Sequence, residues 1–261
     1  MPDALRPRRG TAFVTGGRHG IGGATAIHLA RAGFDVAVLD ITEDEDAVRT
    51  MSEVKTAGSS GLFIKGDVAD VASHEGWIES IASRLGPITC LINNAGVNVP
   101  NRGDMLEATP ESFDHVIGVN LRGTFFLTQA AARHMLDTCR AGMRQTIVVI
   151  SSANAVMVSP EKAVYCLSKS ALSMLAQLFA ARLGAGGIEV FEIQPGLIKT
   201  QMNRAVWETY GTAIAAGASL IRRWGTPDDV AQVATALATG ALPFSTGTMV
   251  PVGGGLHVHR L

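Results

Sequence analysis

The chain has 261 residues, of which 47% are hydrophobic and 17% charged, and its 22 basic and 23 acidic side chains leave a formal net charge of −1. This composition excludes an intrinsically disordered chain, which would be poorer in apolar residues and richer in charge. The near-neutral charge also argues against a nucleic-acid-binding protein, which would show a basic patch.

Seven short apolar runs predict β-strands, in chain order Thr11–Thr15, Asp35–Asp40, Leu62–Lys65, Thr89–Asn93, Thr146–Ser151, Glu189–Gln194 and Thr248–Val252. Continuously apolar runs of this kind, without alternation, are typical of parallel strands covered on both faces. The intervening stretches predict helices over Ile21–Arg31, Asp44–Ala57, Val71–Leu85, Ser112–Arg140, Val164–Leu183 and Pro227–Ala238. This alternation indicates an α/β fold with a doubly wound, seven-stranded parallel sheet flanked by helices on both faces.

The organisation along the chain predicts a single domain over residues 11–261, preceded by a flexible tail of residues 1–10. No apolar segment follows the arginines of the tail, so it does not resemble a signal peptide. No run approaches the roughly 18 apolar residues of a membrane span. The stretch from about 196 to 225 lacks helical or strand periodicity, which predicts a substrate lid.

Cysteine and histidine spacing predicts no metal site. Cys90, Cys139 and Cys166 form neither a CxxC pair nor a zinc-ligand pattern, which indicates reduced thiols in a cytoplasmic protein. The pair His257 and His259 supplies too few ligands for a metal ion.

A glycine-rich turn joins the first strand to the first helix. Gly16, Gly20 and Gly22 lie in the segment Thr15-Gly16-Gly17-Arg18-His19-Gly20-Ile21-Gly22. Such a turn lets the backbone approach a pyrophosphate and directs a helix N-terminus at it. Asp40 closes the second strand, where a carboxylate would accept hydrogen bonds from a ribose diol. The turn and Asp40 together predict a dinucleotide site that favours NAD.

Tyr165 and Lys169 are four residues apart on a predicted helix, so their side chains share one face. A phenol has a pKa near 10, and a nearby ammonium favours the phenolate. We therefore expect Lys169 to lower the pKa of Tyr165 and suit it to general acid–base catalysis.

Several motifs occur in order along the chain: Thr15-Gly16-x-x-x-Gly20-Ile21-Gly22, Asn93-Asn94-Ala95-Gly96, Asn120, Ser152, Tyr165-x-x-x-Lys169 and Pro195-Gly196-x-Ile198-x-Thr200. Together they resemble the short-chain dehydrogenase/reductase superfamily, from about Gly10 to His257. The resemblance implies a Rossmann fold and a catalytic set of Asn120, Ser152, Tyr165 and Lys169. Ser152 would bind the reacting oxygen, in preference to the adjacent Ser151. Asn120 would interrupt its helix and hold a water behind Lys169.

The same resemblance implies the cofactor contacts. The expected cofactor-binding residues are Gly16, Arg18, His19, Gly20, Ile21, Gly22, Asp40, Asp67, Val68, Asn94, Ala95, Gly96, Tyr165, Lys169, Pro195, Gly196, Ile198 and Thr200. One departure from the family pattern is Gly253, where the last strand of relatives commonly continues with Asp; that position is structural.

The expected function is hydride transfer between NAD(H) and a secondary alcohol or ketone, with NADP less favoured. Two alternatives stay open. A 3-oxoacyl-carrier-protein reductase would typically use NADPH and need a basic docking surface, and Asp40 argues against it. A non-catalytic dinucleotide sensor would usually lack the Tyr165–Lys169 pair.

The substrate is a small alcohol or carbonyl compound whose identity the sequence does not give. Ala153–Lys162 and the predicted lid would form the pocket. Its apolar candidates are Val156, Met157, Val158, Met202, Val206 and Trp207, and Arg204, Arg222 and Arg223 would face either an anionic substrate or solvent. The helices Ser112–Arg140 and Val164–Leu183 carry more apolar positions than one buried face needs. In the family these two helices pair across a two-fold axis, and the resemblance therefore implies a homotetramer. Neither a nucleic-acid nor a membrane partner is expected.

Overall fold

The computed structural model describes residues 9–138 and 142–258. Its sheet contains β1 (Thr11–Thr15), β2 (Asp35–Asp40), β3 (Gly61–Lys65), β4 (Ile88–Asn93), β5 (Gln145–Ile150), β6 (Ile188–Pro195) and β7 (Met249–Val252). All neighbours pair in parallel, in the order β3-β2-β1-β4-β5-β6-β7. The predicted seven-stranded parallel sheet is confirmed: β1 and β2 have the predicted bounds, and the ends of the other strands are shifted by at most one residue.

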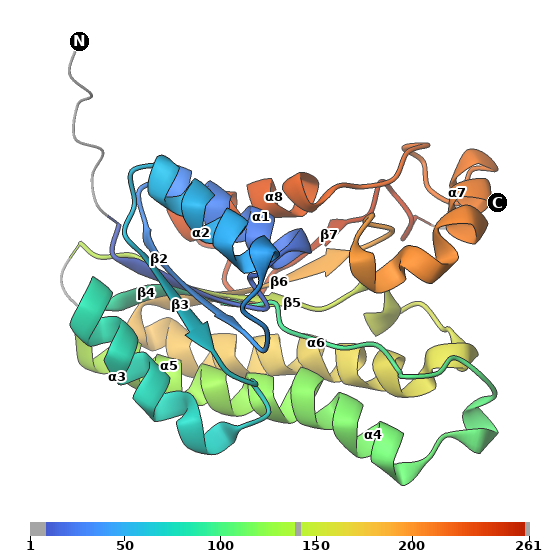
Figure 1. Cartoon of the computed structure of the whole chain (residues 1–261), viewed down its shortest axis with the longest axis horizontal. Coiled ribbons are helices and arrows are strands. Elements are labelled where there is room, and N and C mark those ends of the chain that lie inside the picture. Colours follow the sequence, from blue (N-terminus) through green and yellow to red (C-terminus); the bar gives the residue numbers. More distant parts are fainter. Residues whose placement is uncertain (1–8, 139–141, 259–261) are drawn as a thin grey trace.

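Helices cover both faces of this sheet (Figure 1). One layer contains α1 (Gly20–Arg31), α2 (Glu45–Thr56) and α8 (Pro227–Thr239), and the other α3 (His74–Leu85), α4 (Pro110–Ile117), α5 (Thr124–Thr138) and α6 (Ala163–Leu183). Each layer buries its own apolar cluster: Phe13 and Leu172 belong to one, Val14 and Leu29 to the other. Every residue of β4 and β5 is buried, which explains why these runs are continuously apolar.

The carboxyl ends of β1 and β4 are joined by side-chain hydrogen bonds. The Thr15 hydroxyl accepts from the backbone N–H groups of Asn94 and Ala95, both at 3.0 Å. The Asn94 amide donates to the carbonyls of Thr15 and Gly16, at 2.9 and 3.0 Å. The chain runs from β1 outward to β2 and β3 but returns to β4 on the other side of β1, and this reversal of strand order is where doubly wound sheets bind ligands.

The helix expected over Ser112–Arg140 is interrupted. A π-helical segment, Gly118–Gly123, separates α4 from α5, and residues 139–141 lie outside the described part. Asn120 explains the interruption: its side chain accepts from Val97 N–H at 2.7 Å and donates to the Val97 carbonyl at 2.9 Å. The side chain thereby pairs with a distant loop, and the widened turn accommodates it.

The segment from 196 to 225 is more regular than expected. It contains the 3₁₀ turn Gln201–Val206 and the helix α7 (Trp207–Ala215). Asn203 organises its start, accepting from Thr200 N–H at 3.1 Å and from the Trp207 indole at 2.9 Å. This segment consists of turns and one short helix, which are too short to give a clear periodic pattern in the sequence. Further 3₁₀ turns are Val71–Ser73, Met105–Glu107, Ala153–Ala155, Pro160–Lys162 and Gly184–Gly186.

The expected tail of residues 1–10 lies mostly outside the described residues, which begin at Arg9. Arg9 and Gly10 themselves are tied to the domain. Arg9 N–H donates to the Gly33 carbonyl and Gly10 accepts from Asp35 N–H, both at 3.1 Å. These two residues therefore belong to the fold and not to a tail.

One helical stretch, Pro160–Gly186, is long and apolar enough to cross a membrane by length and composition alone. No continuous apolar run marks it in the sequence, because serines, lysine and glutamine interrupt it. Leu172, Leu175 and Ala176 of this stretch pack in the core against the sheet. One face of the stretch therefore belongs to the core of this fold.

Candidate active site

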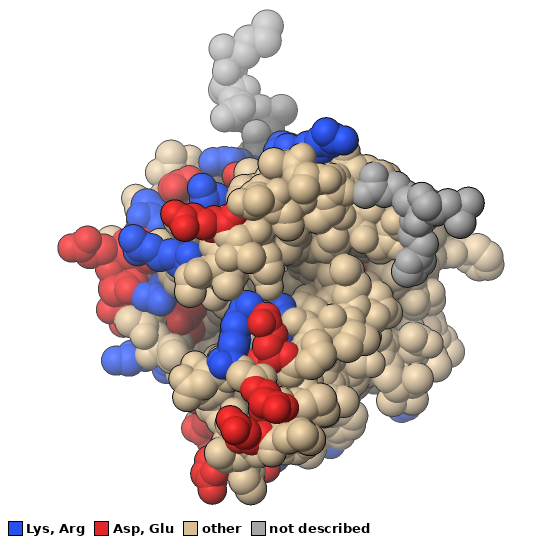
Figure 2. All heavy atoms as spheres, turned by 90° about the vertical axis from the view of Figure 1, so that its right-hand side faces the viewer, with Lys and Arg blue, Asp and Glu red and all other residues tan. Residues whose placement is uncertain are grey.

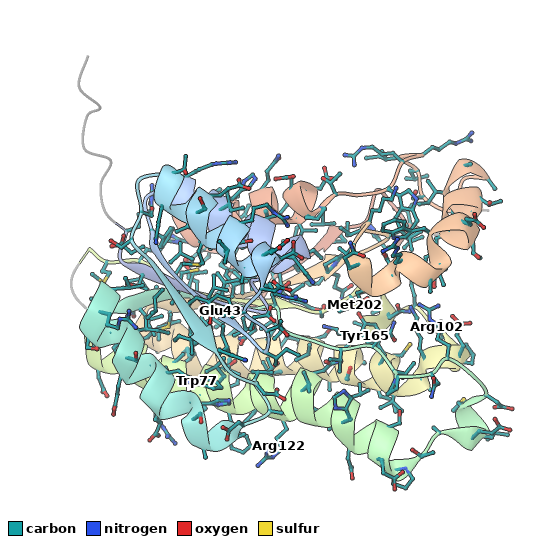
Figure 3. The ribbon with its side chains drawn as sticks, viewed as in Figure 1. Glu43, Trp77, Arg102, Arg122, Tyr165 and Met202 are labelled. Atoms are coloured by element: carbon teal, nitrogen blue, oxygen red, sulfur yellow. The ribbon has the colours of Figure 1, made fainter. Side chains whose placement is uncertain are left out.

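A cavity of about 590 Å³ opens where the strands end, between the two helical layers. Figure 3 shows Tyr165 and Arg102 below this opening and Met202 above it. Of the residues expected to bind cofactor or react, all line the cavity except Gly22 and Asn120. The fold thus brings together residues from the ends of six strands, β1 to β6, and from the start of α6.

The glycine turn forms one end of the cavity. Gly16 and Gly20 have φ of +63° and +58°, a conformation that side chains rarely adopt. A Cβ atom on Gly16 would lie 2.9 Å from the Ala95 Cα, and one on Gly22 would collide with the Gly16 carbonyl. No side chain caps the N-terminus of α1 at His19. Its backbone N–H groups therefore suit a phosphate.

Arg18 and two carboxylates lie at the end of β2. Asp40 accepts from Arg18 N–H at 3.2 Å, and the Arg18 Nε lies 3.7 Å from an Asp40 oxygen. The same guanidinium contacts the Asp44 carboxylate. Burial opposes ionisation of Asp44, but backbone hydrogen bonds and Arg18 outweigh it and lower its pKa. Two negative groups therefore surround one positive group at this end.

Tyr165 lies at the other end of the cavity, hydrogen-bonded to Ser152. The Ser152 hydroxyl also accepts from Asn154 N–H at 3.1 Å. Ser151 is turned into the structure, where its hydroxyl contacts the Glu192 carboxylate and donates to the Ile193 carbonyl at 3.2 Å. The two adjacent serines thus have different surroundings, and only Ser152 reaches Tyr165.

The expected lowering of the Tyr165 pKa is wrong in this structure. Burial raises the pKa of Tyr165, and the hydrogen bond from Ser152 opposes this only in part. The Lys169 Nζ lies 5.6 Å from the Tyr165 ring centroid and donates to the Ile150 carbonyl at 3.1 Å. Burial lowers the pKa of Lys169 to about 8, with Glu192 opposing. Burial therefore determines the direction of both pKa shifts, since it disfavours the charged form of each group.

Asn120 lies behind this pair and not in the cavity wall. It is fully buried and donates to the Ser168 hydroxyl at 2.9 Å as well as binding Val97. A Cβ on Gly96 would be 3.2 Å from the Asn120 carbonyl oxygen and 3.4 Å from the Lys169 Nζ. These two polar atoms therefore lie on the same side of Gly96.

Four polar residues of the site were not singled out from the sequence. Lys162, Arg102 and Tyr210 line the cavity, and Glu192 is buried and contacts Ser151. Two of them left a signal. Lys162 ends the segment Ala153–Lys162 that was expected to form the pocket, directly before the helix of Tyr165. Glu192 is an acid within an otherwise apolar strand, and such residues are rarely buried without a partner.

The expected substrate pocket is only partly correct. Met157, Val158 and Met202 line the cavity, but Val156, Val206 and Trp207 do not. Arg204, Arg222 and Arg223 also lie outside its lining. Arg223 instead forms a two-pronged ion pair with Asp229, at 2.7 and 2.8 Å.

Residues 9–138 and 142–258 hold no group of three or more His, Cys, Asp or Glu side chains that is arranged to bind a metal ion. Cys90 and Cys166 are free thiols, and Cys139 lies outside the described residues.

Known proteins resemble the chain over almost its full length. Residues 16–257 match the family described as enoyl-(acyl carrier protein) reductase. Versicolorin reductase from Emericella nidulans is 33% identical, covering 94% of each chain. L-rhamnose 1-dehydrogenase (NAD(P)⁺) from Sphingomonas is 30% identical, covering 95% of this chain and 96% of the other. The crystal structure of a 3-oxoacyl-[acyl-carrier protein] reductase from Brucella melitensis in complex with NAD superposes with a TM-score of 0.94, at 41% identity over 97% of this chain and 99% of that one.

The buried Lys169 predicts a specific pH dependence of stability. Its pKa is about 8 in the folded protein against an ordinary 10.5, so between these pH values the unfolded chain binds more protons. The free energy of unfolding, relative to a Lys169→Met variant, should therefore rise with pH over this window, by roughly 3 kcal/mol at most. Urea unfolding at pH 7.5 to 10.5 measures it.

Lys55→Met, which removes an exposed lysine from α2, is the matched control for loss of a positive charge. Parallel stability profiles for wild type and Lys169→Met would contradict the lowered pKa.

Proposed function

Because this chain belongs to the short-chain dehydrogenase/reductase superfamily, we propose that it is an NAD(H)-dependent oxidoreductase that interconverts a secondary alcohol and a ketone through Ser152, Tyr165, Lys169 and Asn120. Superfamily membership itself makes the chain an oxidoreductase of the short-chain dehydrogenase/reductase kind. The observation that carries the finer proposal is the hydrogen bond between Ser152 and Tyr165, in the same cavity as the glycine turn.

The cavity residues fit a nicotinamide dinucleotide. The open glycine turn and uncapped α1 N-terminus suit the pyrophosphate, and Asp40 suits a ribose diol. Asp67 and Val68 would bracket the adenine, and Pro195, Gly196, Ile198 and Thr200 would face the nicotinamide. Small residues at Ala95 and Gly96 leave room for the ribose. When bound, the cofactor supplies or accepts the hydride.

Tyr165 would move the proton. Since burial raises its pKa, the phenol is protonated at neutral pH and ready to donate to a ketone oxygen. Ser152 would hydrogen-bond the same oxygen and stabilise the charge that develops there. For alcohol oxidation, Tyr165 must first lose its proton, which the nearby Lys169 ammonium favours.

Asn120 would act by positioning. Its amide holds the Val97 backbone, and its carbonyl oxygen and the Lys169 Nζ lie on the same side of Gly96. An ordered water between these atoms would connect Lys169 to the interior, as the family resemblance implies. Asn120 thereby supports proton transfer without lining the cavity.

The 3-oxoacyl-carrier-protein reductase alternative is supported by the name of the structural relative from Brucella melitensis. An acidic carrier protein would dock on a basic surface. Figure 2 shows mixed charges on a mostly uncharged face, at the end of the molecule where α7 lies. Two of the arginines near the cavity and the predicted lid already have carboxylate partners: Arg102 pairs with Glu161 and Arg223 with Asp229. A substrate that is not attached to a carrier protein is therefore favoured. The presence of both Tyr165 and Lys169 disfavours a non-catalytic dinucleotide sensor.

Three further proposals accompany this function. We place the enzyme in the cytoplasm, we expect neither nucleic-acid nor membrane partners, and we assign the segment 196–225 as a lid over the substrate. Met202 and Tyr210 support the lid, because both belong to this segment and line the cavity.

Replacing Tyr165 by Phe tests the catalytic assignment. The change removes the proton donor but keeps the ring, so turnover should fall by about 10²–10⁴ while the fold and NAD binding persist. NADH oxidation with a ketone panel measures turnover, and calorimetry measures binding. Lys169→Ala should weaken cofactor binding as well. Near-normal turnover in the Phe variant would overturn the assignment.

Cofactor choice follows from the charges beside β2. Asp40, Asp44 and Arg18 sum to one net negative charge, which would repel the 2′-phosphate of NADP. Two unit charges about 4 Å apart repel by roughly 4 kcal/mol at an effective dielectric constant near 20, and salt reduces this value. We expect kcat/KM to favour NAD over NADP by at least about tenfold.

Asp40→Ala should narrow that preference, because it removes the carboxylate and leaves Arg18 with Asp44 alone. Steady-state kinetics with both cofactors measures the change. Equal or better use of NADP by the wild type would refute the role of Asp40.

Exposed apolar side chains support a homotetramer. Phe113 on α4, Phe125 on α5 and Leu167, Met174 and Leu178 on α6 are each at least 36% exposed. A monomer rarely leaves such a surface to water. Light scattering at micromolar concentration should give the mass of four chains, and a monomeric mass would refute the assembly.

A further inference from the structure

Lys162 is a buried cation at the substrate end of the cavity. Lys162 is the last residue of the 3₁₀ turn Pro160–Lys162, directly before α6, and it is only 9% exposed. The Nζ lies 5.5 Å from the centroid of the Tyr165 ring, and the residue lines the cavity. Within the described ranges 9–138 and 142–258, no carboxylate forms an ion pair with this ammonium.

The other cations of the cavity already have partners. Arg18 lies between Asp40 and Asp44. Arg102 donates to Glu161 at 2.8 Å and to the Tyr210 hydroxyl at 3.2 Å. Lys169 donates to the Ile150 carbonyl and has Glu192 as its negative neighbour. Lys162 therefore holds the uncompensated positive charge of the site.

The Lys162 side chain lines the cavity and is 9% exposed, and its ammonium has no carboxylate partner in the described chain. A ligand that brings a negative charge into the cavity would therefore gain a charge-assisted hydrogen bond there. The lining of the same cavity includes the apolar side chains Met157, Val158 and Met202 and polar ones such as Asn154 and Ser159. An anion would find Lys162 close by and Arg102 as a second positive group of the same cavity.

We propose that the substrate carries a carboxylate, bound by the Lys162 ammonium, a few bonds from the carbon that reacts beside Tyr165. This inference rests on the proposed function and narrows its substrate to a short hydroxy acid or oxo acid. In reduction, hydride adds to the ketone carbon, Tyr165 gives its proton to the oxygen, and the carboxylate is unchanged. Lys162 therefore decides which substrate binds and takes no part in the chemistry.

A series of oxo acids tests the assignment. The probes are 2-oxobutanoate, 3-oxobutanoate and 4-oxopentanoate, which vary the spacing between ketone and carboxylate, each beside its methyl ester. With NADH, the wild type should prefer at least one acid over its ester by about tenfold or more in kcat/KM. Lys162→Met should reduce that preference about 10- to 100-fold, mainly through KM, as expected for a lost hydrogen bond to a charged group.

Lys162→Arg should restore most of the preference, because it retains the charge. Lys55→Met, at an exposed position on α2, should leave the preference unaltered. Equal use of acids and esters by the wild type would overturn the carboxylate assignment while leaving the oxidoreductase function intact. An equal loss for acid and ester in Lys162→Met would overturn it too.

Measuring the binding of the acids tests the carboxylate site independently of the proposed reaction. Calorimetry of the three acids with the protein–NADH complex should show binding that Lys162→Met weakens at least about tenfold and that Tyr165→Phe retains. Binding of this kind without turnover of any probe would support the carboxylate site and count against the proposed reaction. No acid binding by the wild type, or binding that Lys162→Met does not weaken, would overturn the site.

Discussion

The buried ammonium of Lys169 is the group on which the geometry of the reactive end depends. It donates to the carbonyl of Ile150, at the end of β5, and has the carboxylate of Glu192, on β6, as its negative neighbour. Glu192 in turn accepts from Ser173 on α6 at 2.6 Å and from Gln194 at 2.8 Å. This network ties α6 to both strands, and so it places Tyr165, one turn before Lys169, against Ser152.

Charge divides the cavity into two ends with different chemistry. The end beside β2 holds two carboxylates around Arg18. The end beside Tyr165 holds three cations, Lys162, Arg102 and Lys169, against two carboxylates, Glu161 and Glu192. A nicotinamide dinucleotide with a free ribose diol matches the first end, and an anionic substrate matches the second. The same strand-order reversal that opens the cavity therefore separates recognition of cofactor from recognition of substrate.

The sequence predicts most elements well because each depends on residues close together in the chain. Apolar runs such as β5 mark strands covered on both faces. The family resemblance implied that Asn120 interrupts the helix over Ser112–Arg140, and the π-helical segment Gly118–Gly123 lies there. The partner of Asn120 was not predictable, because its side chain bonds Val97, 23 residues away. Segment 196–225 gave no periodic pattern, and its start depends on the side chain of Asn203.

By itself the sequence determined the parallel sheet, the glycine turn at its first strand end and the Tyr165–Lys169 pair, since spacing within one element dictates which side chains share a face. The directions in which the pKa values of Tyr165 and Lys169 shift depend on the tertiary structure alone, and so do the partners of Arg223 and Lys162. Burial by distant segments raises the pKa of Tyr165. Arg223 meets Asp229 whereas Lys162 meets no carboxylate of the described chain. Desolvation and charge pairing act through space, between residues whose separation in sequence carries no periodic signal.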